Sequence, residues 1–255
     1  MSESLQISRE GRVLRLTLNR PDKRNALSIE LCHALSCAFD EALKDPKVGA
    51  ILIDSTGPVF CAGMDLDEVL SPDAAPRTYI HEKIFTIGAR SNKPIVAAVQ
   101  GPALGGGLGL VANAHIAVAA HGSTFGLTEI RIAMWPFVIF RSIKNAVGER
   151  RALELSLTGK IFNTPEAMQW GFIHEVTPAI ELDDRATAIA TQLAESSAQA
   201  ICTGLDFVHA ARDANPLTFG KLASEYRGRA FESADFAEGV TAFREKRRPS
   251  WPSIK

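Results

Sequence analysis

Two glycine-containing turns offer backbone groups that could take part in chemistry. One covers Phe60–Leu66, and the other covers Gly101–Gly109, directly after the apolar run Pro94–Gln100. Glycine lets the backbone approach a ligand closely and adopt positive φ angles. Where such a turn opens a helix, unbonded N–H groups point outward and the helix dipole favours negative charge. The second turn therefore predicts either an anion-stabilising site or a close helix–strand contact that requires small residues.

Several other kinds of site are not indicated by the sequence. The glycine run matches neither the dinucleotide-binding fingerprint nor a P-loop, and no serine lies in a nucleophile elbow. The six histidines lack metal-ligand spacing, so no metal site is predicted. The four cysteines contain no CxxC pair and are expected to be reduced thiols.

The composition argues against two classes of partner. The chain carries 28 Lys and Arg against 29 Asp and Glu, a net charge of −1. No broad basic surface for nucleic acid or for an anionic membrane is therefore expected. Apolar runs such as Ile95–Val99 are too short to span a bilayer, and the N-terminus lacks the pattern of a signal peptide. We expect a soluble, cytoplasmic protein.

Strand and helix patterns alternate through the first part of the chain. Apolar runs predict strands at Val13–Leu18, Ala50–Asp54, Pro94–Gln100 and His115–Ala120. Helical patterns lie at Ile29–Lys44 with Ser28 as the N-cap, at Ile80–Ala89, and from the glycine turn through Ala114. This alternation predicts an α/β fold with parallel crossovers. The segment Ser71–Arg77, rich in Pro and Asp, is expected to be mobile.

The remainder of the chain is mainly helical in pattern. Helices are expected at Arg151–Leu157, Pro165–Trp170, Leu182–Glu195, Ala198–Ala214, Thr218–Ala230 and Ala234–Phe243. A boundary near Ser196 then divides the chain into an α/β core, residues 1–195, and a helical C-terminal region, residues 196–255.

Seven motifs, taken in order along the chain, resemble the signature blocks of the crotonase superfamily, the enoyl-CoA hydratase/isomerase family. They are Asn19–Pro21 with Asn25–Leu27, Phe60–Leu66, Gly101–Gly107, Phe125–Glu129, Leu157–Lys160, Ala167–Ile173 and Phe243–Arg247. The resemblance implies a spiral core of repeated ββα units and a C-terminal helical region used for trimerisation. It also implies a homotrimer or a hexamer built as a dimer of trimers. The implied substrate is an acyl-CoA, and no further cofactor is expected because coenzyme A arrives as part of the substrate.

The resemblance also assigns roles to individual residues. The backbone N–H groups of Met64 and Gly106 match the oxyanion hole that stabilises charge on a thioester oxygen. Residues that match segments around coenzyme A are Lys23, Arg24, Ala26, Ala62, Asp65, Leu66, Phe243 and Lys246. The last two correspond to positions that, in similar proteins, often act across subunits. For Lys246, a solvated helix end is an equally open interpretation.

The acid/base residues depart from the family pattern. Hydratases of this family resemble one another in having two glutamates; Glu129 matches the second, but Gly109 stands where the first is expected. Adding water to an enoyl thioester uses both carboxylates, whereas moving the double bond needs one base. The resemblance therefore implies an enoyl-CoA isomerase with Glu129 as the single acid/base. An enoyl-CoA hydratase with a substitute for the missing carboxylate, a non-catalytic thioester-binding protein and another superfamily reaction are the alternatives.

A second departure follows Glu129. Many members of the family have a glycine-rich helix start where this chain has the bulky segment Ile132–Phe140. These side chains are predicted either to line the acyl end of the pocket or to pack in the core.

Overall fold

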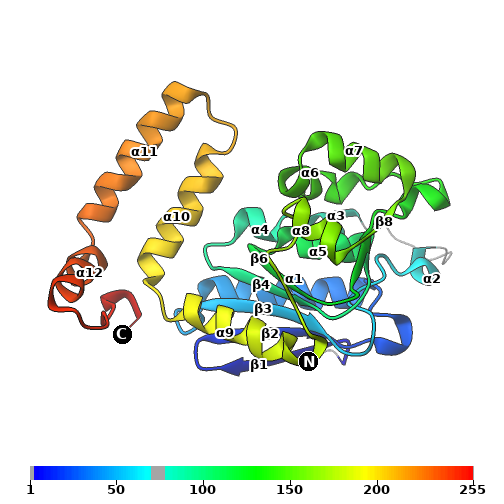
Figure 1. Cartoon of the computed structure of the whole chain (residues 1–255), viewed down its shortest axis with the longest axis horizontal. Helices are drawn as coiled ribbons and strands as arrows, with labels where there is room; N and C mark the ends of the chain where they lie inside the picture. The colour runs from blue at the N-terminus through cyan, green and yellow to red at the C-terminus, as the bar shows by residue number, and fades with distance from the viewer. Residues whose placement is uncertain (1–2, 70–77, 255) are drawn as a thin grey trace.

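A six-stranded sheet forms the centre of the molecule (Figure 1). The computed structural model describes residues 3–69 and 78–254. In the sheet, β1 runs antiparallel to β2, and every other neighbouring pair is parallel. In spatial order the strands are β1 (Leu5–Glu10), β2 (Val13–Leu18), β3 (Ala50–Ser55), β4 (Ile95–Val99), β6 (Ile116–Ala120) and β9 (Glu175–Thr177). The predicted α/β fold with parallel crossovers is confirmed.

Both faces of the central strands are buried, each in a different hydrophobic cluster. On β3, Ala50 and Leu52 pack with α9 (Leu182–Ala194), whereas Ile51 and Ile53 belong to the larger core on the other face. Because successive side chains of a strand point to opposite faces, burial on both faces requires an apolar residue at nearly every position. This requirement explains why the strands show as short continuous apolar runs in the sequence.

A second, small sheet stands beside the first. It contains β5 (Ala103–Leu104), β7 (Thr124–Gly126) and β8 (Ile161–Asn163), with β5 parallel to β7 and β7 antiparallel to β8. The chain twice passes from a strand of the large sheet to a strand of the small sheet and then to helix. The first pass is β4, β5 and α5 (Gly106–Asn113), and the second is β6, β7 and the 3₁₀ helix η2 (Glu129–Ile132), followed by α6 (Phe137–Val147). These passes are the expected ββα units.

The helix α1 (Ile29–Lys44) begins where the sequence predicts. The Oγ atom of Ser28 accepts a hydrogen bond from the N–H of Leu31 at 3.2 Å. A second cap comes from Glu68 in α2 (Leu66–Val69), whose Oε2 atom accepts from the N–H of Ile29 at 2.8 Å. Both caps satisfy N–H groups that have no partner inside the helix.

The predicted helix Ile80–Ala89 is wrong as a single element. The structure has α3 (Thr78–Ile84) and α4 (Ile87–Arg90), separated at Phe85 and Thr86. The Thr86 hydroxyl donates to the carbonyl of Lys83 at 3.1 Å, an alternative to regular helical bonding. The break also lets Gly88 pack directly on Asn113, because a Cβ at Gly88 would lie 2.3 Å from the Asn113 carbonyl oxygen.

Some elements are not among those predicted from the sequence. They are β1, the short strands β5, β7, β8 and β9, and the helix α6, whose buried Ile139 and Ile143 do have the four-residue spacing of a helix. Two- and three-residue strands are too short for a periodic pattern, and β1 is an edge strand whose side chains after Leu5 are exposed. The segment Ser71–Arg77, expected to be mobile, lies outside the described residues.

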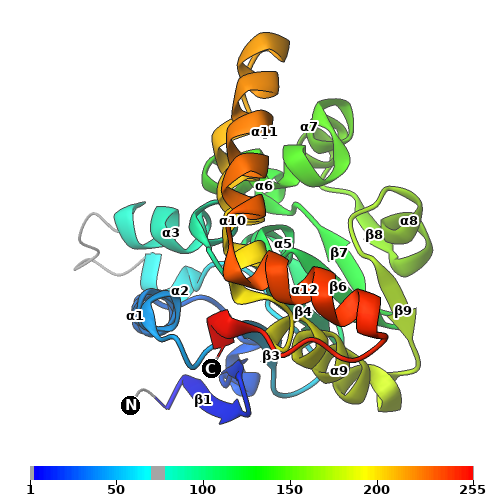
Figure 2. The same ribbon diagram turned by 90° about the vertical axis from the view of Figure 1, so that its left-hand side faces the viewer.

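The remaining helices follow their predicted positions within a few residues. They are α7 (Glu149–Thr158), α8 (Thr164–Gln169), α10 (Ala198–Ala211), α11 (Pro216–Phe231) and α12 (Ala234–Glu245), with 3₁₀ helices at Pro21–Lys23, Ala179–Glu181 and Pro252–Ile254. In Figure 1, α10 and α11 stand away from the sheet, and in Figure 2 the end of α11 extends above the rest of the molecule. The carboxylate of Asp235 accepts from the hydroxyls of Ser197 and Ser253, and so ties the start of α10 to α12 and the chain end.

No helix within residues 3–69 and 78–254 combines the length and the apolar character needed to cross a membrane.

Candidate active site

Three parallel segments bring the predicted catalytic residues to one edge of the small sheet. β5 pairs in parallel with β7, and Cys61 forms a further parallel bridge with Ala103 of β5. Met64 follows Cys61 by three residues, Gly106 follows β5 by two, and Glu129 follows β7 by three. Parallel segments end on the same side, so these three residues arrive together even though 65 residues separate the first from the last.

The turns that carry Met64 and Gly106 are in direct backbone contact. Gly63 has a φ angle of +94°, and a Cβ placed on it would lie 3.3 Å from the nitrogen of Gly106. A Cβ on Gly106 would in turn lie 3.6 Å from the Cα of Gly63. Glycine is therefore required at Gly63 both by its backbone conformation and by the close approach of the neighbouring turn.

The amides of Met64 and Gly106 make no hydrogen bond to another described residue. Leu27 bonds to both neighbours of Met64: its N–H donates to Gly63 at 2.7 Å and its carbonyl accepts from Asp65 at 3.2 Å. In a parallel bridge the intervening residue faces the other way, so the Met64 N–H points away from Leu27. Gly106 is the first residue of α5, where N–H groups have no partner inside the helix.

Glu129 places a half-buried carboxylate beside these amides. A Cβ on Gly105 would lie 3.1 Å from its Oε1 atom, so the side chain lies against the glycine turn. Its Oε2 atom is buried and has no hydrogen-bond partner among the described residues. Burial raises the pKa of Glu129 above the ordinary value for a glutamate. A carboxyl group with a raised pKa holds a proton more readily and is a stronger base once it is ionised.

The position of the missing second carboxylate is filled by hydrocarbon. A Cβ on Gly109 would lie 2.4 Å from Cγ2 of Ile139 and 3.0 Å from Cε1 of Phe85. Ile139 is only 2% exposed and Phe85 6%. Ile139 belongs to the bulky segment that replaces the family's glycine-rich helix start, so at this residue the core-packing interpretation of that segment is confirmed.

The two loops expected around coenzyme A lie side by side. The N–H of Ala62 donates to the carbonyl of Arg24 at 3.0 Å, and the N–H of Ala26 donates to that of Lys23 at 3.0 Å. Lys23 and Arg24 are exposed, and the ammonium group of Lys23 forms an ion pair with Asp67 at 3.1 Å. The structure thus brings Lys23, Arg24, Ala26 and Ala62 next to the turn that carries Met64.

Asp65 and Leu66 extend the same turn in different ways. Leu66 is exposed at the start of α2, whereas Asp65 is buried and its carboxylate pairs with the Arg20 guanidinium at 2.9 Å. Arg20 also donates to the carbonyl of Ala26 at 2.6 Å. The side chain of Asp65 therefore holds the two loops together rather than facing outward.

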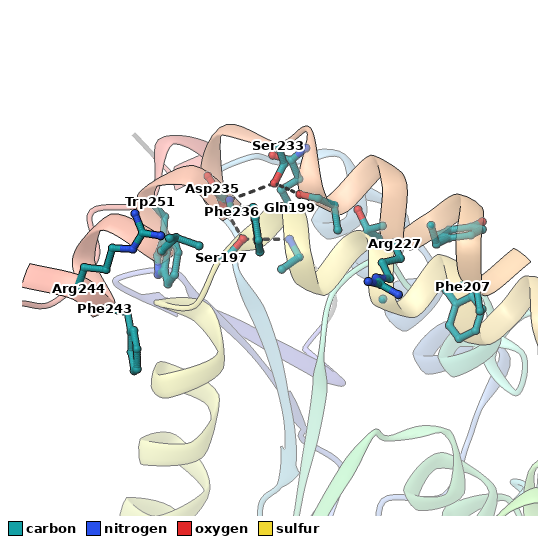
Figure 3. A pocket seen from close by; sticks show the side chains of 18 residues that line it. Ser197, Gln199, Phe207, Arg227, Ser233, Asp235, Phe236, Phe243, Arg244 and Trp251 are labelled. Carbon is teal, nitrogen blue, oxygen red and sulfur yellow. Dashed lines mark hydrogen bonds between the residues drawn. The ribbon is translucent and has the colours of Figure 1, made fainter. Parts of the chain in front are cut away.

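Phe243 and Lys246 are not brought to this site within one chain. They lie on α12 and at its C-cap, at the opposite end of the molecule from α2 (Figure 1). Phe243, 85% exposed, lines an apolar pocket of about 660 Å³ among α10, α11 and α12. Figure 3 shows this pocket, which includes none of Met64, Gly106 and Glu129.

Sequence reasoning missed residues that build the site without carrying its chemistry. Asn25, fully buried with a φ angle of +53°, donates to the carbonyls of Thr56 and Val59 and accepts from Arg20. Its place in the first motif was the only signal. Ile139 lies in the bulky segment that follows Glu129, but the sequence does not show which surface Ile139 or Phe85 will contact.

The described residues contain no group of three or more His, Cys, Asp and Glu that could hold a metal ion. Cys32 and Cys61 are poor nucleophiles, because burial raises the pKa of each thiol to about 12.

The geometry of these residues defines a class of site. Two adjacent backbone amides with no described partner can stabilise negative charge on an oxygen, and a neighbouring carboxyl group can move a proton. This arrangement suits a reaction that passes through an enolate.

The chain matches the model of the enoyl-CoA hydratase/isomerase family over residues 8–253, and it belongs to that family. The predicted family and the predicted crotonase-like fold are thereby confirmed, and the family is one of enzymes. Among similar sequences, a probable enoyl-CoA hydratase of Mycobacterium tuberculosis is 34% identical and covers 98% of this chain and 98% of its own length. The mevalonyl-coenzyme A hydratase of Aspergillus fumigatus is 32% identical over 95% of this chain and 92% of its own.

Solved structures agree with this assignment. An enoyl-CoA hydratase of Mycobacterium smegmatis superposes with a TM-score of 0.92 at 28% identity, covering 98% of this chain and 99% of its own. The human enoyl coenzyme A hydratase domain-containing protein 3 gives a TM-score of 0.92 at 26% identity, covering 97% of this chain and 100% of its own.

Proposed function

We propose that this chain is an enoyl-CoA isomerase, which moves a carbon–carbon double bond between positions 3 and 2 of an enoyl-CoA. The observation that carries this proposal is the single carboxylate of Glu129 beside the Met64 and Gly106 amides, with Gly109 at the other acid/base position. One base that takes a proton from one carbon and returns it to another is sufficient for this reaction.

In the proposed mechanism, the amides of Met64 and Gly106 bind the thioester oxygen. Glu129 removes a proton from C2 of a 3-enoyl thioester, and the electron pair of the C–H bond forms an enolate on that oxygen. The electrons then return through the C3–C4 double bond, which moves to C2–C3, while Glu129 delivers its proton to C4. The raised pKa of Glu129 supports this cycle, because a carboxyl group with an elevated pKa is a better base when ionised and readily holds the proton.

In this proposal, coenzyme A lies along two neighbouring segments, the loop Lys23–Ala26 and the turn Ala62–Leu66. Lys23 and Arg24 supply positive charge for its phosphates, and the backbone of Ala26, Ala62, Asp65 and Leu66 forms the wall beside them. No other cofactor is required, because coenzyme A enters with the substrate. Phe243 and Lys246 contribute from a second copy of the chain, since α12 lies at the far end of its own.

A homotrimer, or a hexamer of two trimers, is the proposed assembly. The large apolar side chains exposed on the C-terminal helices support it, because single copies rarely leave so many in water. These side chains are Val208, Leu217, Phe219, Phe231, Phe236 and Phe243. The proposed setting is fatty acid metabolism in the cytoplasm.

The test is the variant Glu129→Gln, assayed with a 3-enoyl-CoA and with a trans-2-enoyl-CoA, the products being resolved by chromatography and mass. We expect the wild type to interconvert the isomers and the variant to lose about 10²- to 10⁴-fold in rate. Binding of the thioester, measured separately, should persist in the variant because the backbone amides are unchanged. Full activity in Glu129→Gln would refute the mechanism.

Hydration is the second candidate, and the names of the relatives favour it. The relatives described above are called hydratases, and they match nearly the whole chain. If the wild type adds water to the trans-2-enoyl-CoA, a group other than residue 109 must activate that water. If both thioesters bind and neither changes, the chain is a binding protein or catalyses another reaction of acyl-CoA.

A further inference from the structure

Gly109 and Ile139 face each other across the contact between α5 and α6. The contact is closed, because a Cβ on Gly109 would approach Cγ2 of Ile139 to 2.4 Å and its Cβ to 3.0 Å. Real Cβ atoms do not tolerate such distances, so a side chain at position 109 cannot enter while Ile139 keeps its place. The absence of a carboxylate at 109 and the presence of a β-branched side chain at 139 are therefore two parts of one packing arrangement.

Phe85 continues the apolar surface formed by Ile139 as far as Gly106, whose N–H group belongs to the proposed oxyanion site. Its ring lies with Cε1 3.0 Å from a Cβ position on Gly109 and with Cζ 3.1 Å from one on Gly106. The ring therefore spans the surface of α5 between the proposed oxyanion site and the position where hydratases carry their second carboxylate. Neither Phe85 nor Ile139 can hydrogen-bond to water, and an ordered water needs two or more polar partners.

We propose that Ile139, together with Phe85, is the specificity-determining residue that restricts this enzyme to isomerisation, by filling the volume that hydration requires for a second carboxylate and its water. This inference rests on the proposed function in taking an enoyl-CoA as the ligand. It adds that the reaction outcome is set by apolar packing on α6, and that restoring the carboxylate alone will not restore hydration.

The decisive comparison uses Gly109→Glu, Ile139→Gly and the double variant, each incubated with a trans-2-enoyl-CoA. The double variant should form the 3-hydroxyacyl-CoA, detected as a mass gain of one water, at a rate at least about tenfold above the wild type. Neither single variant should do so. In Gly109→Glu the side chain of Ile139 still occupies the space, and Ile139→Gly lacks the second carboxylate. The matched control is Gly109→Glu combined with Ile143→Gly, which removes an equally buried isoleucine one turn further along α6. This control should form no more 3-hydroxyacyl-CoA than the wild type.

A second measurement keeps the inference testable if the glutamate variants do not fold. Gly109→Ala should lower the unfolding midpoint of the wild type. The decrease should be smaller when Gly109→Ala is added to Ile139→Ala, because the clashing Cγ2 atom is then absent. If Gly109→Ala costs the same in both backgrounds, the proposed packing relation is wrong. Hydration by Gly109→Glu alone, or its absence in a folded double variant, would overturn the role of Ile139.

These outcomes separate the two proposals. A wild type that isomerises a 3-enoyl-CoA while the folded double variant fails to hydrate leaves the proposed function standing and removes only this inference. A double variant that hydrates, with a wild type that isomerises nothing, removes the isomerase proposal and leaves only the exclusion of hydration by Ile139.

Discussion

At the scale of single residues, the fold changes the acid/base properties of Glu129 by burying its carboxyl group. The same burial that suits it to proton transfer makes its charged form unfavourable, and its Oε2 atom has no partner among the described residues. Its contribution to stability should therefore oppose its contribution to catalysis, as is common at active sites.

The variant Glu129→Gln should be more stable than the wild type near neutral pH. Because the folded-state pKa of Glu129 is raised, the wild type keeps its full stability only below the ordinary glutamate pKa, and loses part of it as pH rises through the raised value. The difference between the two unfolding midpoints should thus be largest at about pH 7 to 8 and shrink toward about pH 4. A variant less stable than the wild type at neutral pH would show that the carboxylate has a stabilising partner.

At the scale of elements, the 3₁₀ helix that begins with Glu129 ends in a strained residue. Ala133, its C-cap, has a φ angle of +57°, and its N–H bonds back to the carbonyls of Glu129 and Ile130. The left-handed conformation costs an alanine about 1 kcal/mol, a cost that glycine does not have. Because these bonds join Ala133 back to Glu129, the conformation of the turn helps to fix the direction from which Glu129 enters the site.

Ala133→Gly should therefore raise the free energy of unfolding by about 0.5 to 1 kcal/mol, measured by urea titration. The matched control is Ala188→Gly, an exposed position inside α9, which should lower it by about 1 kcal/mol. If both substitutions destabilise equally, the backbone strain at Ala133 is absent in solution.

At the scale of the whole molecule, His115 lies where the core meets the C-terminal helices. Its Nδ1 atom accepts from the N–H of Ile95 at 2.9 Å, which requires the neutral ring. Burial, and then charge interactions with His209 and Arg212 at the end of α10, lower the pKa of His115 to about 4. The protonation of His115 thus makes a second contribution to the pH dependence of stability, beside that of Glu129.

We expect the contribution of His115 to stability to fall as pH drops from about 6.5 to about 4, because the unfolded chain binds a proton at His115 that the folded chain excludes. The loss should reach at most about 3 kcal/mol. His115→Asn, which keeps an acceptor for Ile95, should reduce the slope of unfolding free energy against pH in this range. The exposed His121, replaced by Asn, should leave the slope unchanged.

The linear sequence by itself determined much of the architecture. Continuous apolar runs identified β2, β3, β4 and β6, since strands buried on both faces need apolar residues throughout. The glycine spacing around Gly63 and Gly105 identified the turns, because only glycine permits their backbone conformation and close approach. The order of the motifs identified the family, which the match over residues 8–253 confirms.

Only the tertiary structure decided how these parts meet. The pairing of β5 with β7, strands too short to predict, places Gly106 beside Glu129. The break between α3 and α4 allows a contact between Gly88 and Asn113, 25 residues apart, that no local pattern shows. The filling of the Gly109 position by Ile139 and Phe85 is visible in no local pattern, because a sequence shows that a side chain is apolar but not which surface it will cover. Packing between distant segments therefore decides what chemistry the turns can support.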